Sequence, residues 1–262
     1  MKKKISFSLI LIVAFFNVLS AWSEQLSGEQ IMKRVENRPV AKTSRQTTTM
    51  KLINSKGHER VRSVIGYSKD FGDIKKTVMV FQKPSDVKGT GYLSYSYDDV
   101  DKNEDTWLYL PALGKSRRIS GSSKNNSFMG TDFTYDDMGD RKVEEGNHVF
   151  VREETVSGNK CWVVETTPKN PKDMYSKIIS WVRQDVLIPV KVEFYDRHNK
   201  LLKTLVASEI EKTDNIWVAK KLEMHNVQDN HRTVLLLDNI ELNIDVKDTY
   251  FTVASLERGN IR

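Results

Sequence analysis

From Arg45 nearly to the end of the chain, apolar and polar residues alternate with the period of two that is typical of β-strands. Polar turns separate the segments, and Asn54-Ser55-Lys56-Gly57 and Ser157-Gly158-Asn159 predict hairpins. The connections are too short for the crossovers that parallel strands need. The pattern indicates about eleven antiparallel strands and very little helix. Because so long and twisted a sheet must curl, we expect an open, unclosed antiparallel β-barrel.

One helix is predicted close to the start of the chain. Ser27 and Gln30 have the spacing of a capping box, and Ile31, Met32 and Val35 form an apolar stripe behind them. A helix this short is marginal by itself in water, so its stripe is expected to lie on the sheet.

The stretch Trp107–Met138 has the most distinctive pattern in the chain. Trp107–Leu110 alternates as a strand does, Pro111–Gly114 contains turn residues, and Lys115–Ile119 can return as a strand with a basic face. These features predict a hairpin. The segment that follows it, Phe128–Met138, has almost no strand pattern.

Apolar side chains gather on this last segment, where Phe128, Met129, Phe133, Tyr135 and Met138 lie close together. Because loops run over surfaces, such a loop either folds down as a plug on an apolar hollow or forms a place where an apolar ligand docks. We expect both. The alternative is that these side chains only complete the core.

The predicted strands also point to a hollow that needs a cover. Met79 and Phe81 oppose Val78 and Val80, so both faces of that strand are apolar. The candidate covers are the N-terminal helix, the Phe128–Met138 loop and the segment Thr249–Leu256, which are too few and short to fill it. The residues expected to line the cavity or its lid are Ile31, Val35, Met79, Phe81, Leu108, Leu110, Phe128, Met129, Phe133, Met138, Val192 and Phe194.

The N-terminus has the pattern of an export signal. Lys2–Lys4 form a charged region and Ile5–Leu19 an apolar one, and small residues precede a cleavage site near Ser23. The apolar run is shorter than the ~20 residues expected of a spanning helix, although an uncleaved anchor is the alternative. We therefore predict a signal peptide at residues 1–23, a periplasmic location and a single domain at residues 24–262.

Charge and cysteine content narrow the function classes. The formal charge is +6, and removing the three lysines of the predicted signal leaves +3. This weak bias fits loose contact with anionic lipid or an acidic partner and not the dense basic stripe of a nucleic-acid-binding protein. Cys161 is the only cysteine, which excludes an internal disulfide, and we interpret it as a buried, unreactive thiol.

The sequence contains none of the usual catalytic motifs. A nucleophile elbow, a phosphate loop, a dinucleotide fingerprint and a zinc-protease helix are all missing, so we expect no enzymatic activity. His225 and His231 flank a turn, but no acidic or thiol residue lies in register to complete a zinc site with them. We expect neither a metal nor a cofactor.

Two charged clusters have open interpretations. Asp132, Asp136 and Asp137 suggest a cation site or a carboxylate pair, or more economically Asp132 or Thr131 caps a short turn of helix through Asp136. The predicted basic strand face is either a solvated rim or a contact for a lipid headgroup or an acidic membrane partner, because arginine grips phosphate. Its residues are Lys115, Arg117 and Arg118.

Several motifs resemble a known family. Trp-Leu-Tyr-Leu-Pro-Ala-Leu-Gly-Lys-Ser-Arg-Arg-Ile (107–119), followed by Phe-Met-Gly-Thr-Asp-Phe-Thr-Tyr-Asp-Asp-Met (128–138), resembles the LolA-like outer-membrane lipoprotein-sorting proteins. More narrowly it is similar to the branch found beside transporters of the resistance-nodulation-division type. Leu187–Asp196, Ile216–Val218 and Asp248–Phe251 extend the resemblance over nearly all of the chain after the signal.

The resemblance implies an open antiparallel barrel with a helical lid, an apolar cavity and no enzymatic activity. It implies a carrier that holds acyl chains of a lipid or lipoprotein and moves them across the periplasm towards the outer membrane. An inner-membrane transporter of the resistance-nodulation-division type is an implied partner, and we expect a monomer. The alternative is a periplasmic sensor or scaffold that binds a peptide or transporter on the same open sheet without transfer.

Overall fold

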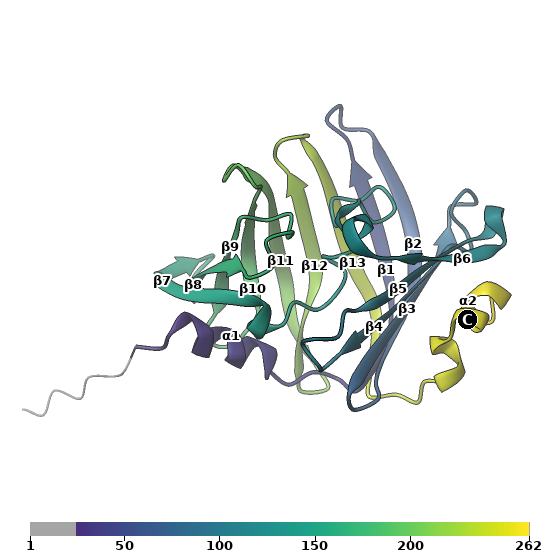
Figure 1. Ribbon diagram of the computed structural model, residues 1–262. Coiled ribbons are helices and arrows are strands. Elements are labelled where there is room, and N and C mark those ends of the chain that lie inside the picture. Colours follow the sequence, from purple (N-terminus) through teal and green to yellow (C-terminus); the bar gives the residue numbers. More distant parts are fainter. Residues whose placement is uncertain (1–24, 262) are drawn as a thin grey trace, which may run out of the picture.

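The computed structural model describes residues 25–261, so the predicted signal peptide, residues 1–23, lies outside the described residues. Within residues 25–261 one sheet of 13 strands has the order β6-β5-β4-β3-β2-β1-β13-β12-β11-β10-β9-β8-β7 and curls into a half-open barrel (Figure 1). The prediction of an open antiparallel barrel is confirmed. The predicted count of about eleven strands was too low, because segments separated by brief polar breaks each form a strand of their own.

The elements follow the predicted segments closely. The strands are β1 (Thr43–Ile53), β2 (Glu59–Asp70), β3 (Ile74–Lys83), β4 (Gly91–Tyr97), β5 (Asp105–Leu110), β6 (Lys115–Ile119), β7 (Gly146–Val156), β8 (Asn159–Pro168), β9 (Lys177–Arg183), β10 (Pro189–Tyr195), β11 (Leu201–Thr213), β12 (Ile216–Asn226) and β13 (His231–Leu242). The helices are α1 (Gly28–Glu36), α2 (Val253–Arg258) and four short 3-10 helices, η1 (Pro111–Leu113), η2 (Gly121–Asn125), η3 (Val143–Glu145) and η4 (Asp248–Phe251). None of the helices in this part of the chain is long and apolar enough to cross a membrane.

The order of the strands explains where the long connection lies. β1 pairs with β13 in the middle of the sheet, and the chain moves outward from β1 to β6 and inward from β7 to β13. β6 and β7 are therefore the two opposite edges. Residues 120–145, which join them and are called the plug below, pack on the concave face between the two halves of the sheet.

Helix α1 forms as predicted and covers one end of the concave face. Ser27 caps it, and the capping box with Gln30 is present. Ile31 and Val35 are buried against Val164 and Val182 on the inner face of β8 and β9. The helix lies so close to β7 that a Cβ at Gly28 would be 2.6 Å from the carbonyl carbon of His148, so only glycine fits there.

The convex face has a cover of its own. Phe251, Leu256 and Ile261, from η4, α2 and the end of the described chain, pack against a patch that includes Val78 and Leu93. The prediction that Thr249–Leu256 is a candidate cover for the concave face was wrong. The alternation on β3 decides this, because Val78 points outward and Phe81 inward, and the C-terminal segment reaches only the outer surface.

Candidate functional site

The tip of the plug is a tight turn that carries aromatic side chains into the hollow. The Phe128 amide donates to the Phe133 carbonyl at 2.7 Å, and the Thr131 hydroxyl donates to the Phe128 carbonyl at 2.7 Å. Met129 and Gly130 take positive φ values of 52° and 77° at the turn. These local bonds hold the tip rigid, so it enters the hollow as one unit.

Phe128 is the centre of the contact between plug and sheet. Its side chain is buried, with its ring centroid 5.3 Å from that of Tyr92 on β4 and 5.5 Å from that of Tyr135 on the plug, both edge to face. Phe81 on β3 lies 6.1 Å away. The loop therefore folds down on an apolar wall, as expected, which also agrees with the alternative that its side chains complete the core; docking of a ligand there stays a prediction.

Ten of the twelve residues predicted for the cavity or lid meet in one cluster. They come from β3, β5, β10 and the plug: Met79, Phe81, Leu108, Leu110, Phe128, Met129, Phe133, Met138, Val192 and Phe194. Ile31 and Val35 belong instead to the neighbouring cluster beneath α1. Whether a ligand touches any of them stays a prediction.

Arg62 on β2 holds the tip of the plug from the sheet. Its guanidinium donates to the Met129 carbonyl at 2.5 Å, and the whole residue is only 8% exposed. Burial lowers the pKa of Arg62. The hydrogen bond to the Met129 carbonyl satisfies this buried donor.

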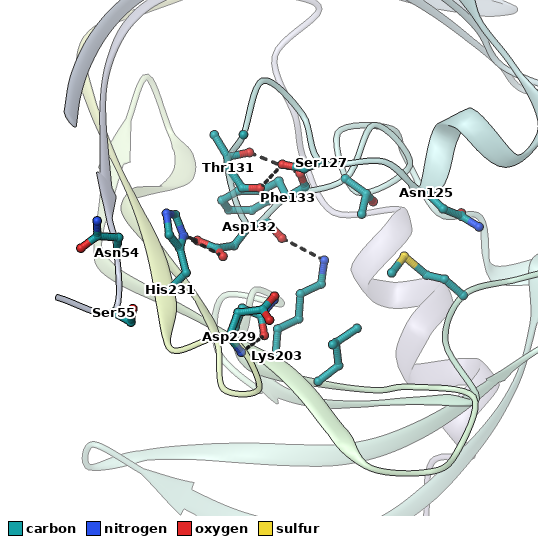
Figure 2. Close-up of a pocket in the computed structure, with 15 residues that line it drawn as sticks. Asn54, Ser55, Asn125, Ser127, Thr131, Asp132, Phe133, Lys203, Asp229 and His231 are labelled. Atoms are coloured by element: carbon teal, nitrogen blue, oxygen red, sulfur yellow. Dashed lines mark hydrogen bonds and ion pairs between the residues drawn. The ribbon is translucent and has the colours of Figure 1, made fainter. Parts of the chain in front are cut away.

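A second attachment joins the plug to β13. His231 Nδ1 lies 2.8 Å from the Asp132 carboxylate, and the Thr233 hydroxyl donates to the same carboxylate at 2.7 Å. The Asp132 amide returns a hydrogen bond to the Thr233 hydroxyl at 3.0 Å. Figure 2 shows Asp132 turned towards His231 at this point. Three short contacts thus fix one plug residue on the sheet.

A third attachment is a buried ion pair with β11. Lys203 Nζ lies 2.6 Å from the Asp137 carboxylate, and the two side chains are 3% and 5% exposed. Tyr175 donates to the other carboxylate oxygen at 2.8 Å. Burial opposes the charge on Asp137, but Lys203, the Thr134 amide and Tyr175 outweigh it, so the pKa of Asp137 is lowered.

The three plug aspartates do not form a cation site. Asp132 binds His231, Asp137 binds Lys203, and Asp136 accepts from Arg141 at 2.7 Å. Within residues 25–261 no group of three potential ligands is arranged to hold a metal. Neither Asp132 nor Thr131 caps a helical turn, since the turn here is closed by reciprocal bonds between Thr134 and Asp137. The predictions of a cation site and of this cap were therefore wrong.

Glu104, just before β5, meets the plug from the other half of the sheet. Its carboxylate lies 3.6 Å from Lys124 Nζ, and the side chain is 14% exposed. Burial raises the pKa of Glu104 to about 7, with Lys124 only partly offsetting it. The contact is therefore sensitive to pH near neutrality.

Two cavities flank the plug. The larger, about 420 Å³, opens at the end of the barrel where Asp132, Lys203, Asp229 and His231 lie, so its rim is polar (Figure 2). The smaller, about 180 Å³, lies between α1 and the inner face of the sheet. It is lined mainly by apolar groups, among them Met32, Val143, Ile178, Val192 and Phe194. Since ligand sites usually measure ~300–1,000 Å³, the apolar space is too small for a long chain while the plug is in place.

The predicted basic cluster lies on the edge strand β6. Lys115, Arg117 and Arg118 are all exposed there, but Arg118 forms an ion pair with Asp105. Their contact with a headgroup or partner stays a prediction. Cys161 is buried on the convex side of β8, and burial raises its pKa, as expected of an unreactive thiol.

Sequence reasoning missed the sheet residues that hold the plug, Arg62, Lys203 and Thr233. One signal was available: Arg62 and Lys203 occupy inward positions of strands whose neighbouring inward residues, Val64 and Leu205, are apolar. A charge at such a position requires a partner inside the barrel. The identity of that partner depends on the path of the plug and is not visible in the pattern.

Comparison with known proteins identifies the family. A family model described only as an uncharacterized protein matches residues 73–258. A DUF1329 family protein from Desulfovibrio piger is 34% identical, and the match covers 87% of this chain and 97% of that chain with a TM-score of 0.84. The chain belongs to the DUF1329 family.

Two further solved structures share the fold of this chain. A domain from Vibrio parahaemolyticus, described as an outer membrane lipoprotein-sorting protein domain, is 30% identical to this chain. The match covers 88% of this chain and 98% of that domain, with a TM-score of 0.83. A LolA superfamily protein from Nitrosomonas europaea is 18% identical, covers 87% and 98%, and has a TM-score of 0.66. No curated protein matches. The LolA-like fold is confirmed, and the branch associated with resistance-nodulation-division transporters stays a prediction.

Proposed function

We propose that this protein is a periplasmic carrier that holds acyl chains of a lipid or lipoprotein in the hollow behind the plug and moves them towards the outer membrane. The observation that carries the proposal is the plug itself. An apolar wall, open at both sheet edges, is covered by a connection whose aromatic tip is held by a few polar contacts. A cargo chain takes the place of the tip when the plug moves aside.

Simple energetics support such an exchange. Burying an acyl chain of ~16 carbons contributes about 12 kcal/mol at ~0.8 kcal/mol per methylene. The buried plug side chains Phe128, Phe133 and Tyr135 each contribute ~1.5–3 kcal/mol. Met129 and Met138 are half-buried and contribute about half as much, so the five together contribute about 6–12 kcal/mol. Because the two amounts are similar, cargo can enter and leave without a large net change in free energy.

The relatives support the same class of function. The Vibrio parahaemolyticus relative is described as outer membrane lipoprotein-sorting, and the fold is shared with a LolA superfamily protein. The predicted signal peptide supports a periplasmic location, and an inner-membrane transporter of the resistance-nodulation-division type is the proposed donor of cargo. We propose no enzymatic activity for the hollow.

A vesicle assay tests the proposal. Fluorescent phospholipid should move from donor to acceptor vesicles at a rate proportional to protein concentration, and native mass spectrometry should detect bound lipid after purification from a membrane-containing lysate. A protein that takes up no lipid in either experiment contradicts the proposal.

One variant connects the assay to the plug. Thr233→Val keeps the side-chain shape but removes the hydroxyl bound to Asp132, so the plug should open more often and lipid uptake should accelerate about tenfold, the effect of losing ~1.5 kcal/mol. Thr48→Val, another buried threonine on the concave side, is the matched control and should leave uptake unchanged.

The alternative, a scaffold that binds a peptide without transferring lipid, is favoured by one observation. β6 and β7 are unpaired edges within the sheet, and such edges can accept an added strand. A scaffold would not accelerate lipid movement between vesicles, so the same assay separates the two functions.

A further inference from the structure

At three contacts between plug and sheet the sheet supplies the nitrogen and the plug the oxygen, whereas the contact between Glu104 and Lys124 has the opposite polarity. The sheet contributes donors, Arg62 on β2, Lys203 on β11 and His231 on β13, and the plug contributes the acceptors. These acceptors are the Met129 carbonyl and the carboxylates of Asp132 and Asp137. Two carboxylates of the plug are thus held by nitrogen groups of the concave wall.

Lys203 is the most deeply placed of these donors. Its ammonium lies 5.2 Å from the ring centroid of Tyr175 and 5.4 Å from that of Phe194, so its stem is enclosed by aromatic wall. The polar acceptors bonded to it are the Asp132 carbonyl at 3.0 Å and the Asp137 carboxylate at 2.6 Å. Both acceptors belong to the plug and leave with it.

The acidic group that lines the same cavity as Lys203 is Asp229, which is exposed and accepts from Asn226 at 2.8 Å. On β11 itself, Glu211 is bound by Lys220 at 3.1 Å and its side chain is 61% exposed. Glu104 contacts Lys124 at the other half of the sheet. When the plug leaves, Lys203 therefore loses both of its bonded acceptors, and a buried ammonium without a bonded anion is strongly unfavourable.

We propose that the hollow selects amphiphiles with an anionic group, a carboxylate or phosphate on a long acyl chain, and that this group replaces Asp137 on Lys203. The inference rests on the proposed carrier function and names its cargo class. An uncharged chain of equal length fills the same apolar space but leaves Lys203 unpaired, so it competes less well with the plug.

Three probes of one chain length test this selection: hexadecanoate, hexadecyl phosphate and hexadecanol, titrated calorimetrically below the concentrations at which they form micelles. Both anions should bind at least tenfold more tightly than the alcohol. Inorganic phosphate should bind at least a hundredfold more weakly than hexadecyl phosphate, because the chain supplies most of the affinity.

Two variants separate recognition from a structural role. Asp137→Asn weakens the competing plug and keeps the ammonium, so the affinity for hexadecanoate should rise about tenfold. The double variant Lys203→Met with Asp137→Asn removes both charges, and its affinity for hexadecanoate should fall to within threefold of that for hexadecanol. A purely structural pair would move both variants in the same direction. Lys220→Met, which breaks a solvated pair on β12, is the control and should keep the wild-type preference.

The outcomes are distinct. Equal binding of all three probes overturns the inference and leaves the carrier function standing, whereas no binding of any probe overturns both. Binding of inorganic phosphate as tight as that of hexadecyl phosphate also overturns it, since the site would then recognise a free anion. Anion preference that is lost only in the double variant supports it.

Discussion

The two covers of the sheet differ in how they are attached. On the convex face, Phe251 and Leu256 pack into the sheet, and Gly91 leaves room for Leu256 where a Cβ would overlap it. The charge that accompanies this cover is at the surface, where Asp248 is 69% exposed and pairs with Lys69. On the concave face, the Lys203–Asp137 pair is almost fully buried. Close apolar packing suits a permanent cover, whereas a buried charge pair suits a cover whose carboxylate can be replaced by another anion, as proposed above.

The largest predicted effects are losses of unfolding free energy when one buried aromatic side chain is removed from each cover. Phe251→Ala should lower the free energy of unfolding by about 3–5 kcal/mol, the usual cost of removing a buried aromatic side chain. Phe128→Ala should cost less, about 1–3 kcal/mol, because a weakened plug opens locally while the rest of the sheet stays folded. Urea unfolding measures both values, and equal losses would mean that the plug is a fixed part of the core.

The next effect is a pH dependence at the plug. The pKa of Glu104 is raised from 4.5 to about 7, so its contribution to stability is fully present below pH 4.5 and is lost as the pH rises through about 7. The unfolding free energy therefore changes by about 3 kcal/mol between these two pH values, since each pH unit contributes ~1.36 kcal/mol. Glu104→Gln should flatten the dependence of unfolding free energy on pH between these values.

The exposed glutamate Glu153 on β7 provides the control for that measurement. Glu153→Gln should leave the dependence unchanged. A curve for Glu104→Gln with the same slope as the wild type would show that Glu104 does not retain its proton in the folded protein.

A smaller effect distinguishes the two backbone attachments. Arg62→Met removes the donor to Met129 and should increase hydrogen exchange at the Phe128 amide about 10–100-fold, corresponding to ~1.5–3 kcal/mol. Lys69→Met removes the corresponding bond to the Val246 carbonyl on the convex side. It should leave exchange at Phe128 unchanged. Faster exchange in both variants would indicate global and not local opening.

The smallest effect on stability concerns the edge strand β6. Reversing the charges of Lys115 and Arg117 to glutamate should slow transfer between anionic vesicles several-fold and change the unfolding free energy by less than ~0.5 kcal/mol. Arg118 is left in place because its pair with Asp105 belongs to the folded structure. A matching fall in the melting temperature would make the cluster structural.

Much of the fold could be predicted from the sequence because its signals are local. Ser27 and Gln30 predict the capped helix, and the alternation at Met79 and Phe81 predicts which face of β3 points inward. A shift of register was not visible: between Pro189 and Lys191 the pairing with β9 slips by one residue. Val190 therefore packs on the convex side, although it shares its spacing with Val192 and Phe194.

The candidate site was only half predictable for a related reason. The aromatic residues of the plug are apolar wherever the loop lies, so Phe128 and Phe133 could be assigned to the hollow from their type alone. The partners of the aspartates could not, because Asp132 and His231 are 99 residues apart and Asp137 and Lys203 are 66 apart. Only the path of residues 120–145 from one sheet edge to the other brings them together.

The pairing of β1 with β13 has a consequence for assembly. Each half of the sheet is a run of neighbouring hairpins that can form early, but the seam joins residues such as Met50 and Leu235, far apart in sequence. The concave wall is therefore incomplete until the last strand, β13, has paired with β1. A chain whose β13 has not yet paired with β1 has no complete concave wall, so the proposed carrier can accept cargo only after the two halves have met.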